Sequence, residues 1–414
     1  MSFLKLISDK KFWSFFGTGL IVSVAYMDPG NWGTSISSGA SFNYDLLWVI
    51  WLSSGMAMLF QYISGKMGIV GYSLAEIIKI KWQNKFLVFG YWLLAEVAIL
   101  ATDLAEFLGI VVALNLLFGI PMLLGAFIAI ADVLLLLFLT RKTFRTLEYA
   151  FILFVSIIGI GYVYELLITK PDFGLIAIHS IKPILSAETI LLAVGIIGAT
   201  VMPHALFVHS WLMKNKMKEK GFGLDKRIAL RYHLFDNVFS LIIAGLINAA
   251  ILIMAAAAFY NSGFEVATID QAYRTLTPLF GSLAATIFAI ALLSAGVSSS
   301  ITGTLAGQSI MESLTDFKLS ITVRRIITRA INLIPVLIAI LLNIEPLQIL
   351  VYSQVALSLL IPLPLIPLIY YSADKRLMGV FVNKKVTTVL ATIFALIILA
   401  FNGYLLYQAL VVGL

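Results

Sequence analysis

The sequence lacks cysteine and is poor in charge. The 414 residues include no cysteine, which excludes disulfides, thiolate metal sites and thiol catalysis. Asp, Glu, Lys and Arg make up only 12% of the chain, whereas 61% of it is hydrophobic. Apolar runs of about 20 residues recur from end to end, as in helical membrane proteins that cross the bilayer many times. The sequence therefore predicts an all-α polytopic membrane protein that forms a single transmembrane domain, residues 1–414.

Signals for processing and for enzymatic chemistry are also missing. The first apolar run has no small-residue cleavage site, so we expect no cleaved signal peptide. We find no nucleophile–base pair, no phosphate-binding loop and no histidine-rich cluster among the four histidines. An enzyme is therefore not expected, and neither is a permanently bound cofactor.

About eleven transmembrane helices are predicted, joined mostly by short loops. The first and the sixth are broken by polar residues and proline. The approximate limits are 12–40, 45–69, 86–117, 120–140, 147–169, 187–213, 232–259, 273–303, 324–343, 346–371 and 386–411.

The distribution of Lys and Arg predicts the orientation. With the N-terminus placed in the cytoplasm, only Lys170, Lys182 and Arg274 fall outside, and the other 25 of the 28 basic residues fall inside. This asymmetry is a strong positive-inside signal. We therefore expect a cell (plasma) membrane protein with a cytoplasmic N-terminus and an extracytoplasmic C-terminus. The net charge of +7 reflects this bias, and a nucleic-acid partner is not expected.

The two broken helices predict internal symmetry. The first break is Met27-Asp28-Pro29-Gly30-Asn31-Trp32 and the second is Ala199-Thr200-Val201-Met202-Pro203-His204. An odd offset of five spans means that the second half enters the membrane the opposite way round, as in inverted repeats. The repeats would cover about 12–169 and 187–371, with 386–411 as an extra helix. The alternative is a coincidence of two proline kinks.

The breaks carry atoms that can bind a cation. Phe12 to Met27 spans roughly 24 Å of helix, which puts Asp28 near the middle of the bilayer, where an unpaired charge is costly. Available ligands are the Asp28 carboxylate, the Asn31 amide, the Met202 thioether and carbonyls freed near Ala25 and Ala199. Oxygen ligands suit hard cations, and a thioether favours transition metals. Alternatively, Met202 only fills a gap in the core.

These residues resemble the natural resistance-associated macrophage protein (Nramp) family of divalent-metal transporters. The resemblance covers essentially the whole chain. It implies a leucine-transporter-like fold and proton-coupled import of Mn²⁺ and Fe²⁺, often with Cd²⁺, Co²⁺ or Zn²⁺. Asp28, Asn31, Met202 and the Ala199 carbonyl match the family's metal ligands, and Gln354 matches a residue that approaches the metal in the occluded state. The matching stretches are 28–31, 202–204, 94–96, 101–106, 302–308 and 353–355 with Ser358 and Pro362.

Two positions depart from the family's pattern. Ala205 stands where the family usually has Asn, and Ser35 stands where an acid is common. Neither is a predicted ligand, so the departures bear on transport rate, coupling and gating. Relatives that transport Mg²⁺ lack the Met and Asn ligands, both of which this chain keeps.

Membrane-embedded ionisable residues predict a proton route. Glu96, Asp103 and Glu106 share one face of the third span by their spacing. With the neighbouring groups they have the composition of a proton relay, the role that the family resemblance also implies. A purely structural salt-bridge network is the alternative, and Arg324 and Arg325 could instead be cytoplasmic anchors. The predicted route comprises His204, His209, Glu96, Asp103, Glu106, Arg324, Arg325 and Arg329; Asp132 and Asp236 are further embedded acids, and His179 and His233 are expected at the surface.

Two other functions remain open from the sequence. An organic-substrate symporter, for example for an amino acid, would need a site without an anionic residue, which Asp28 contradicts. The second is a channel or a non-transporting metal receptor; a channel would need a continuous pore, whereas two broken helices with one anionic site suit alternating access. The expected partners are divalent metal ions, protons and the lipid bilayer. The dominant metal, the proton stoichiometry and the oligomeric state are not determined by the sequence.

Overall fold

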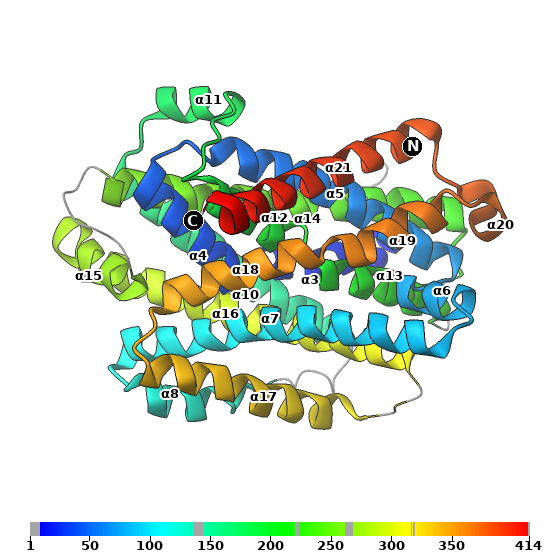
Figure 1. Ribbon diagram of the computed structural model, residues 1–414, viewed down its shortest axis with the longest axis horizontal. Helices are drawn as coiled ribbons and strands as arrows, with labels where there is room; N and C mark the ends of the chain where they lie inside the picture. Colours follow the sequence, from blue (N-terminus) through cyan, green and yellow to red (C-terminus); the bar gives the residue numbers. More distant parts are fainter. Residues whose placement is uncertain are drawn as a thin grey trace.

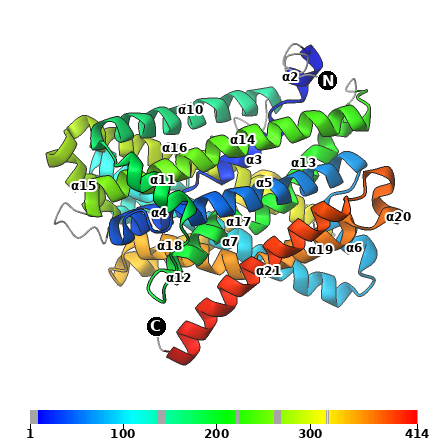
Figure 2. The ribbon, with the colours of Figure 1, turned by 90° about the horizontal axis from the view of Figure 1, so that it is seen from above.

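The computed structural model describes residues 9–133, 135, 144–219, 223–260, 268–315, 317 and 319–412. Within these ranges the chain is almost entirely helical and contains no strand, which confirms the all-α prediction. Figures 1 and 2 show the helices running mostly along the long axis of the molecule and packed side by side in both views.

The first half of the chain contains the first broken helix and the long helices that follow it. The break separates α3 from α4, and α7 is the longest helix of this half. The elements are α2 (Lys10–Phe15), α3 (Thr18–Ala25), α4 (Pro29–Phe42), α5 (Leu47–Val70), α6 (Leu74–Lys81), α7 (Lys85–Phe118), α8 (Met122–Ala129) and α10 (Phe144–Thr169).

The second half begins after a short external helix and repeats the pattern of a broken helix followed by long ones. Its break separates α12 from α13. The elements are α11 (Phe173–Ile181), α12 (Ile190–Thr200), α13 (Pro203–Lys218), α14 (Lys226–Ala255), η1 (Ala256–Tyr260), α15 (Ile269–Phe280), α16 (Ser282–Leu314), α17 (Ile321–Leu341), α18 (Pro346–Leu360), α19 (Pro362–Ser372), α20 (Lys375–Met378), η2 (Gly379–Phe381), α21 (Lys385–Tyr407) and η3 (Gln408–Val412).

Eight helices in the described part of the chain are long and apolar enough to cross a membrane. The other three predicted spans differ for separate reasons. The first is divided among α2, α3 and α4; the span predicted at 120–140 runs beyond the described residues after α8; and α17 carries three arginines near its start. The eight apolar helices identify the chain as a multi-pass membrane protein.

One predicted boundary is wrong. The span expected at 273–303 is two helices, because Gly281 adopts a positive φ of 91° and ends α15. Glycine takes this conformation at no steric cost. Helix α16 then starts at Ser282 and continues to Leu314, so the stretch 302–308 lies inside the helix instead of after it.

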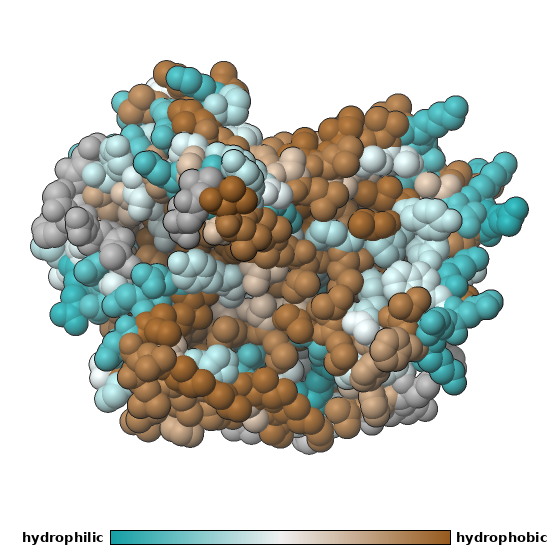
Figure 3. Space-filling view, in the orientation of Figure 1, coloured by the Kyte–Doolittle hydropathy of each residue, from teal (hydrophilic) through white to brown (hydrophobic). Residues whose placement is uncertain are grey.

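The surface is divided as a bilayer requires. Figure 3 shows apolar residues along the flank over α8 and α17, and hydrophilic side chains projecting at the end where Figure 1 places α6 and α20. Both short helices carry basic residues in their last turn, Lys79 and Lys81 in α6 and Lys375 and Arg376 in α20. The Lys- and Arg-rich end is therefore distinct from the end that carries α11 and α15.

Candidate metal site

The first break is built by Asp28 and Pro29. Asp28 caps α4: its carboxylate accepts hydrogen bonds from the backbone N–H groups of Gly30 at 3.1 Å and Asn31 at 2.9 Å. Pro29 has no N–H and takes the first helical position, where none is needed. The same proline leaves the Ala25 carbonyl without its usual helical donor. A charged group and a freed carbonyl therefore sit together in a fully buried place.

The second break has the same backbone arrangement as the first, with different side chains. Pro203 starts α13 and so frees the Ala199 carbonyl four residues earlier. Met202 occupies the capping position, where it makes no side-chain cap hydrogen bond. Its side chain is fully buried. The break thus offers one carbonyl oxygen and one thioether sulfur.

Asn31 joins the two breaks. Its amide Nδ2 donates to Asp28 Oδ1 at 2.8 Å and to the Ala199 carbonyl, also at 2.8 Å. On the other side, Asn248 Nδ2 of α14 donates to Asn31 Oδ1 at 3.1 Å and to the Tyr26 carbonyl at 2.8 Å. Asn248 is not among the residues predicted from the sequence, although an asparagine inside the apolar run of α14 already indicates a functional position. In this structure the positive edge of the Asn31 amide lies between two candidate ligand oxygens.

Gln354 of α18 closes the site from one side. A Cβ atom built on Gly30 would overlap the Gln354 amide and lie 2.8 Å from Asp28 Oδ2, so the amide lies directly over the Asp28 cap. The side chain is fully buried, and its Oε1 has no hydrogen-bond partner among the described residues. Gln354 therefore has an amide oxygen available to a cation beside Asp28.

The oxygen ligands that these contacts bring together are one carboxylate, side-chain amides and the Ala199 carbonyl, and the Met202 thioether is buried in the same break as Ala199. The described residues contain no group of three or more His, Cys, Asp or Glu placed to hold a metal. The predicted ligand set is not such a cluster, because Asp28 is its only member of those residue types. All five predicted ligand residues are 1% exposed or less, so the site lies inside the packed helices.

Replacing Gly30 with alanine should disturb the site without adding charge. The added Cβ must displace the Gln354 amide, and overpacking of this kind costs about 1–3 kcal/mol. We expect Cd²⁺ affinity, measured by calorimetry, to fall roughly tenfold, since about 1.4 kcal/mol is tenfold. Gly90→Ala in α7 is the matched control, because nothing lies within 4 Å of its Cβ position. Equal affinities in the two variants would show that Gln354 has no part in binding.

His204 connects the second break to α7. Its Nδ1 lies 3.0 Å from Thr102 Oγ1, and the Thr102 hydroxyl donates to the Ala98 carbonyl at 3.1 Å. The hydroxyl therefore accepts from Nδ1–H, and Nε2 keeps its lone pair, for which no partner is found among the described residues. Thr102 precedes Asp103, so His204 lies next to the acidic face of α7. In the described part of the chain no hydrogen bond joins His204 to Asp28.

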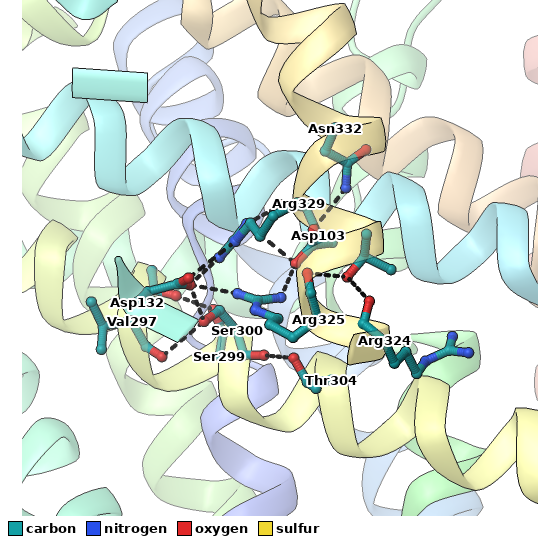
Figure 4. Close-up of polar contacts among 12 residues, drawn as sticks. Asp103, Asp132, Val297, Ser299, Ser300, Thr304, Arg324, Arg325, Arg329 and Asn332 are labelled. Carbon is teal, nitrogen blue, oxygen red and sulfur yellow. Dashed lines mark hydrogen bonds and ion pairs between the residues drawn. The ribbon is translucent and has the colours of Figure 1, made fainter. Parts of the chain in front are cut away.

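Asp103 of α7 meets the arginines of α17 (Figure 4). Asp103 pairs with Arg325 and, at 3.2 Å, with Arg329; Asn332 donates to its Oδ2 at 2.8 Å. Asp132, just after α8, pairs with both Arg325 and Arg329. All four charged side chains are at most 5% exposed. They form a neutral cluster of two acids and two arginines.

A second pair lies nearer the basic end. Arg324 Nη2 is 2.6 Å from Glu96 Oε2, and the two side chains are 7% and 16% exposed. Trp92 Nε1 donates to Glu96 Oε1 at 2.8 Å. Arg324 and Arg325 are thus buried and ion-paired, unlike surface anchors.

Glu106 differs from the other acids of α7. It is fully buried, and neither carboxyl oxygen has a hydrogen-bond partner among the described residues. A Cβ atom built on Gly303 of α16 would be 3.0 Å from Glu106 Oε2, so the carboxyl group lies against a glycine. Since Arg325 and Arg329 are already balanced by Asp103 and Asp132, Glu106 is the surplus acid of this region.

The remaining ionisable residues lie away from α7. His209 Nδ1 is 2.9 Å from Gln61 Oε1 of α5, so His209 faces α5 and not the acid cluster. Asp236 of α14 accepts from Gly19 N at 2.8 Å and Thr18 Oγ1 at 3.1 Å at the start of α3. His233 is fully buried, which corrects the expectation of a surface residue. His179 lies at the surface on α11, as expected, and its Nδ1 is 3.1 Å from Asp45 Oδ1.

Comparisons with known proteins agree with this geometry. The sequence profile of the family described as "Natural resistance-associated macrophage protein-like" matches residues 19–408. The chain is 42% identical over 396 residues to the "Divalent metal cation transporter MntH" of Verminephrobacter eiseniae, covering 95% of this chain and 89% of that protein. It is also 42% identical over 409 residues to the protein of the same name from Listeria monocytogenes, covering 97% and 91%.

Solved structures of transporters are also similar to this chain. A manganese transporter of Eremococcus coleocola superposes with a TM-score of 0.85 at 33% identity, covering 95% of this chain and 87% of that one. Mhp1, a nucleobase-cation-symport-1 family transporter, superposes with a TM-score of 0.62 at 15% identity, over 95% and 88%. The second likeness shows the fold alone, and it confirms the predicted leucine-transporter-like architecture. Because the profile covers most of the chain and relatives exceed 40% identity over nearly all of it, this protein belongs to the Nramp family.

Proposed function

We propose that this protein imports divalent transition-metal ions, Mn²⁺ and Fe²⁺ first and softer ions such as Cd²⁺ as well, by alternating access. The observation that carries the proposal is the meeting of the two breaks through Asn31 between Asp28 and the Ala199 carbonyl. Asp28 gives the site a negative charge, and Met202 gives it a soft ligand. The function is transport, so the expectation that the chain is not an enzyme agrees with its family.

Metal binding requires Asn31 to turn. In the structure its NH₂ group faces the Asp28 and Ala199 oxygens, and a cation needs the oxygen of the amide there instead. Asp28, Asn31, the Ala199 carbonyl and Met202 then surround the ion. Gln354, whose amide already lies over Gly30, adds its Oε1, which has no hydrogen-bond partner among the described residues. The metal is a substrate that passes through and not a resident cofactor.

We further propose that protons travel with the metal along α7. The support is the set of groups along α7: His204, whose Nε2 has no hydrogen-bond partner among the described residues, then Thr102 and the surplus acid Glu106, and the clusters around Asp103 and Glu96 towards the basic end. Ionisable groups inside a membrane are costly and typically functional. The ion pairs can hold α7 against α17 at the same time, so the structural role and the relay are compatible. His209 contacts Gln61 of α5, so it would join the proposed route through that residue and not through α7.

The proposed setting is the plasma membrane, with the Lys- and Arg-rich end of the molecule in the cytoplasm. The two repeats are proposed at about 12–169 and 187–371, since each begins with a helix broken at an Asp- or Met-capped proline. Helix α21 is the additional helix of this scheme.

The test of function is ion flux in proteoliposomes with an imposed pH gradient. We expect Mn²⁺ to enter, Cd²⁺ to compete strongly, and Mg²⁺ and Ca²⁺ to compete weakly. Internal acidification should accompany Mn²⁺ entry. Uptake of an amino acid in place of Mn²⁺ would support an organic-substrate symporter instead.

Replacing Met202 with alanine should change selectivity. The substitution removes the soft ligand, so Cd²⁺ binding should weaken more than Mn²⁺ binding, while Ca²⁺ and Mg²⁺ gain relative to both. We expect a loss of roughly tenfold or more in Cd²⁺ affinity by calorimetry, the range typical of a disturbed metal site. Met56→Ala in α5, another fully buried methionine, controls for the loss of packing. An unchanged Cd²⁺ affinity would assign Met202 to packing alone.

A further inference from the structure

Two buried histidines face each other outside the site described above. His209 of α13 and His233 of α14 are both fully buried, and their ring centroids are 4.9 Å apart with an interplanar angle of 79°. We propose that this pair is a second, weaker binding site for divalent transition metals, which receives the ion after it leaves Asp28. The proposal rests on the import function proposed above.

The hydrogen bonds of the two rings define their tautomers. His209 Nδ1 is 2.9 Å from Gln61 Oε1, an oxygen that only accepts, so Nδ1 carries the proton. His233 Nε2 is 3.1 Å from the Tyr62 carbonyl, so there Nε2 carries it. Each ring thus has a lone pair on its other nitrogen, and neither His209 Nε2 nor His233 Nδ1 has a partner among the described residues. Metal-binding histidines have this arrangement, with one N–H on a fixed acceptor and the other nitrogen free.

A glycine keeps the two rings close. A Cβ atom built on Gly65 of α5 would overlap the His233 ring and would lie 3.0 Å from His209 Nε2. The His209 lone-pair nitrogen therefore lies beside the edge of His233 that carries Cε1, one bond from Nδ1. A rotation of the His233 ring that turns Nδ1 towards His209 Nε2 would direct both lone pairs at one ion, with loss of the His233 hydrogen bond to the Tyr62 carbonyl.

The pair is connected to the first break. Gln61, which accepts from His209, donates through Nε2 to the Tyr26 hydroxyl at 2.7 Å, and Tyr26 directly follows α3. From the second break the chain reaches His209 in α13 and then the lysines at the end of that helix. The histidines therefore lie between the Asp28 site and the Lys- and Arg-rich end, on the side where imported metal leaves.

The chemistry of the pair predicts weak binding of a particular class of ion. Imidazole suits Zn²⁺, Fe²⁺ and related transition metals, whereas Mg²⁺ and Ca²⁺ prefer oxygen. Both ligands are neutral, and Lys66, which contacts Asn383, follows Gly65 directly. Affinity below that of the Asp28 site follows from the missing anion, and it favours release in the cytoplasmic direction.

The test uses the full chain in lipid nanodiscs with Asp28→Asn and His204→Gln, so that neither group contributes. Mn²⁺ is added, and pulsed electron paramagnetic resonance measures nitrogen coupling to the bound ion. We expect weakly bound Mn²⁺ with the nitrogen coupling of imidazole. Adding His233→Gln or His209→Gln should abolish this coupling and lower the Mn²⁺ affinity by about tenfold or more. His179→Gln is the control, because that histidine is paired with Asp45 near α11.

Two results would overturn the proposal: no nitrogen coupling in the starting variant, or coupling that survives His233→Gln. Equilibrium dialysis of the unmutated chain provides a check that does not depend on the folding of any variant. Two Mn²⁺ ions of unequal affinity support the second site, and a single ion at saturation rejects it. A chain that binds none would reject the proposed function instead.

Discussion

Mn²⁺ uptake should disappear when Asp28 becomes asparagine. The substitution removes the charge of the site but keeps an oxygen that can cap α4, since asparagine is a good N-cap. Removing one partner of a buried charge pair costs roughly 3–5 kcal/mol, which exceeds two orders of magnitude in affinity. We therefore expect uptake in proteoliposomes to fall to background, while thermal unfolding in detergent shows a folded protein.

Asp172 is the matched control for this variant. It caps α11 in the same way, accepting from Gly174 N at 2.8 Å and Leu175 N at 3.1 Å, but it lies at the exposed end of the molecule. Asp172→Asn should transport Mn²⁺ at the unmutated rate. If Asp28→Asn also did so, the metal would have to bind elsewhere.

The second large effect concerns coupling. Glu106→Gln keeps the shape of the side chain and removes the surplus acid beside Gly303. A divalent ion entering at about −100 mV already gains roughly 4.6 kcal/mol, twice the value for one charge, so voltage alone can drive uptake. We expect Mn²⁺ entry to continue while the accompanying acidification falls by most of its amplitude.

The measurement records Mn²⁺ entry and internal pH in the same vesicles. Glu165→Gln in α10 is a suitable control, because that glutamate is also buried and its carboxyl oxygens have no hydrogen-bond partner among the described residues. Should Glu106→Gln and Asp103→Asn both retain the unmutated ratio of acidification to Mn²⁺ entry, α7 is not the proton route. Its acids then serve only to hold α17.

The sequence predicted the breaks and the fold well because their causes are local. A proline four residues after Ala25 or Ala199 must free that carbonyl, and an aspartate before Pro29 must cap the next helix. Partners across the bundle have no such local cause. No residue near Asp103 in the chain indicates that Arg325 and Arg329 each pair with both Asp103 and Asp132. The burial of His233 depends on the packing of α14 against α5.

The boundary at Gly281 failed for a related reason. The apolar end of α15 at Leu279 and Phe280 runs directly into the apolar start of α16, and the backbone conformation of Gly281 separates the two helices. Asn248 was overlooked because a single amide in an apolar helix does not indicate which residue it contacts. Its importance appears only when the Asn31 amide is seen between it and Asp28.

The Asn31 amide also sets a condition on how the site accepts an ion. Its NH₂ group donates to the Asp28 carboxylate and to the Ala199 carbonyl, and its oxygen accepts from Asn248, so turning the amide towards a cation exchanges three hydrogen bonds at once. We therefore expect Asn248, which contacts the amide oxygen, to affect how fast an ion enters the site as well as how tightly the ion is held.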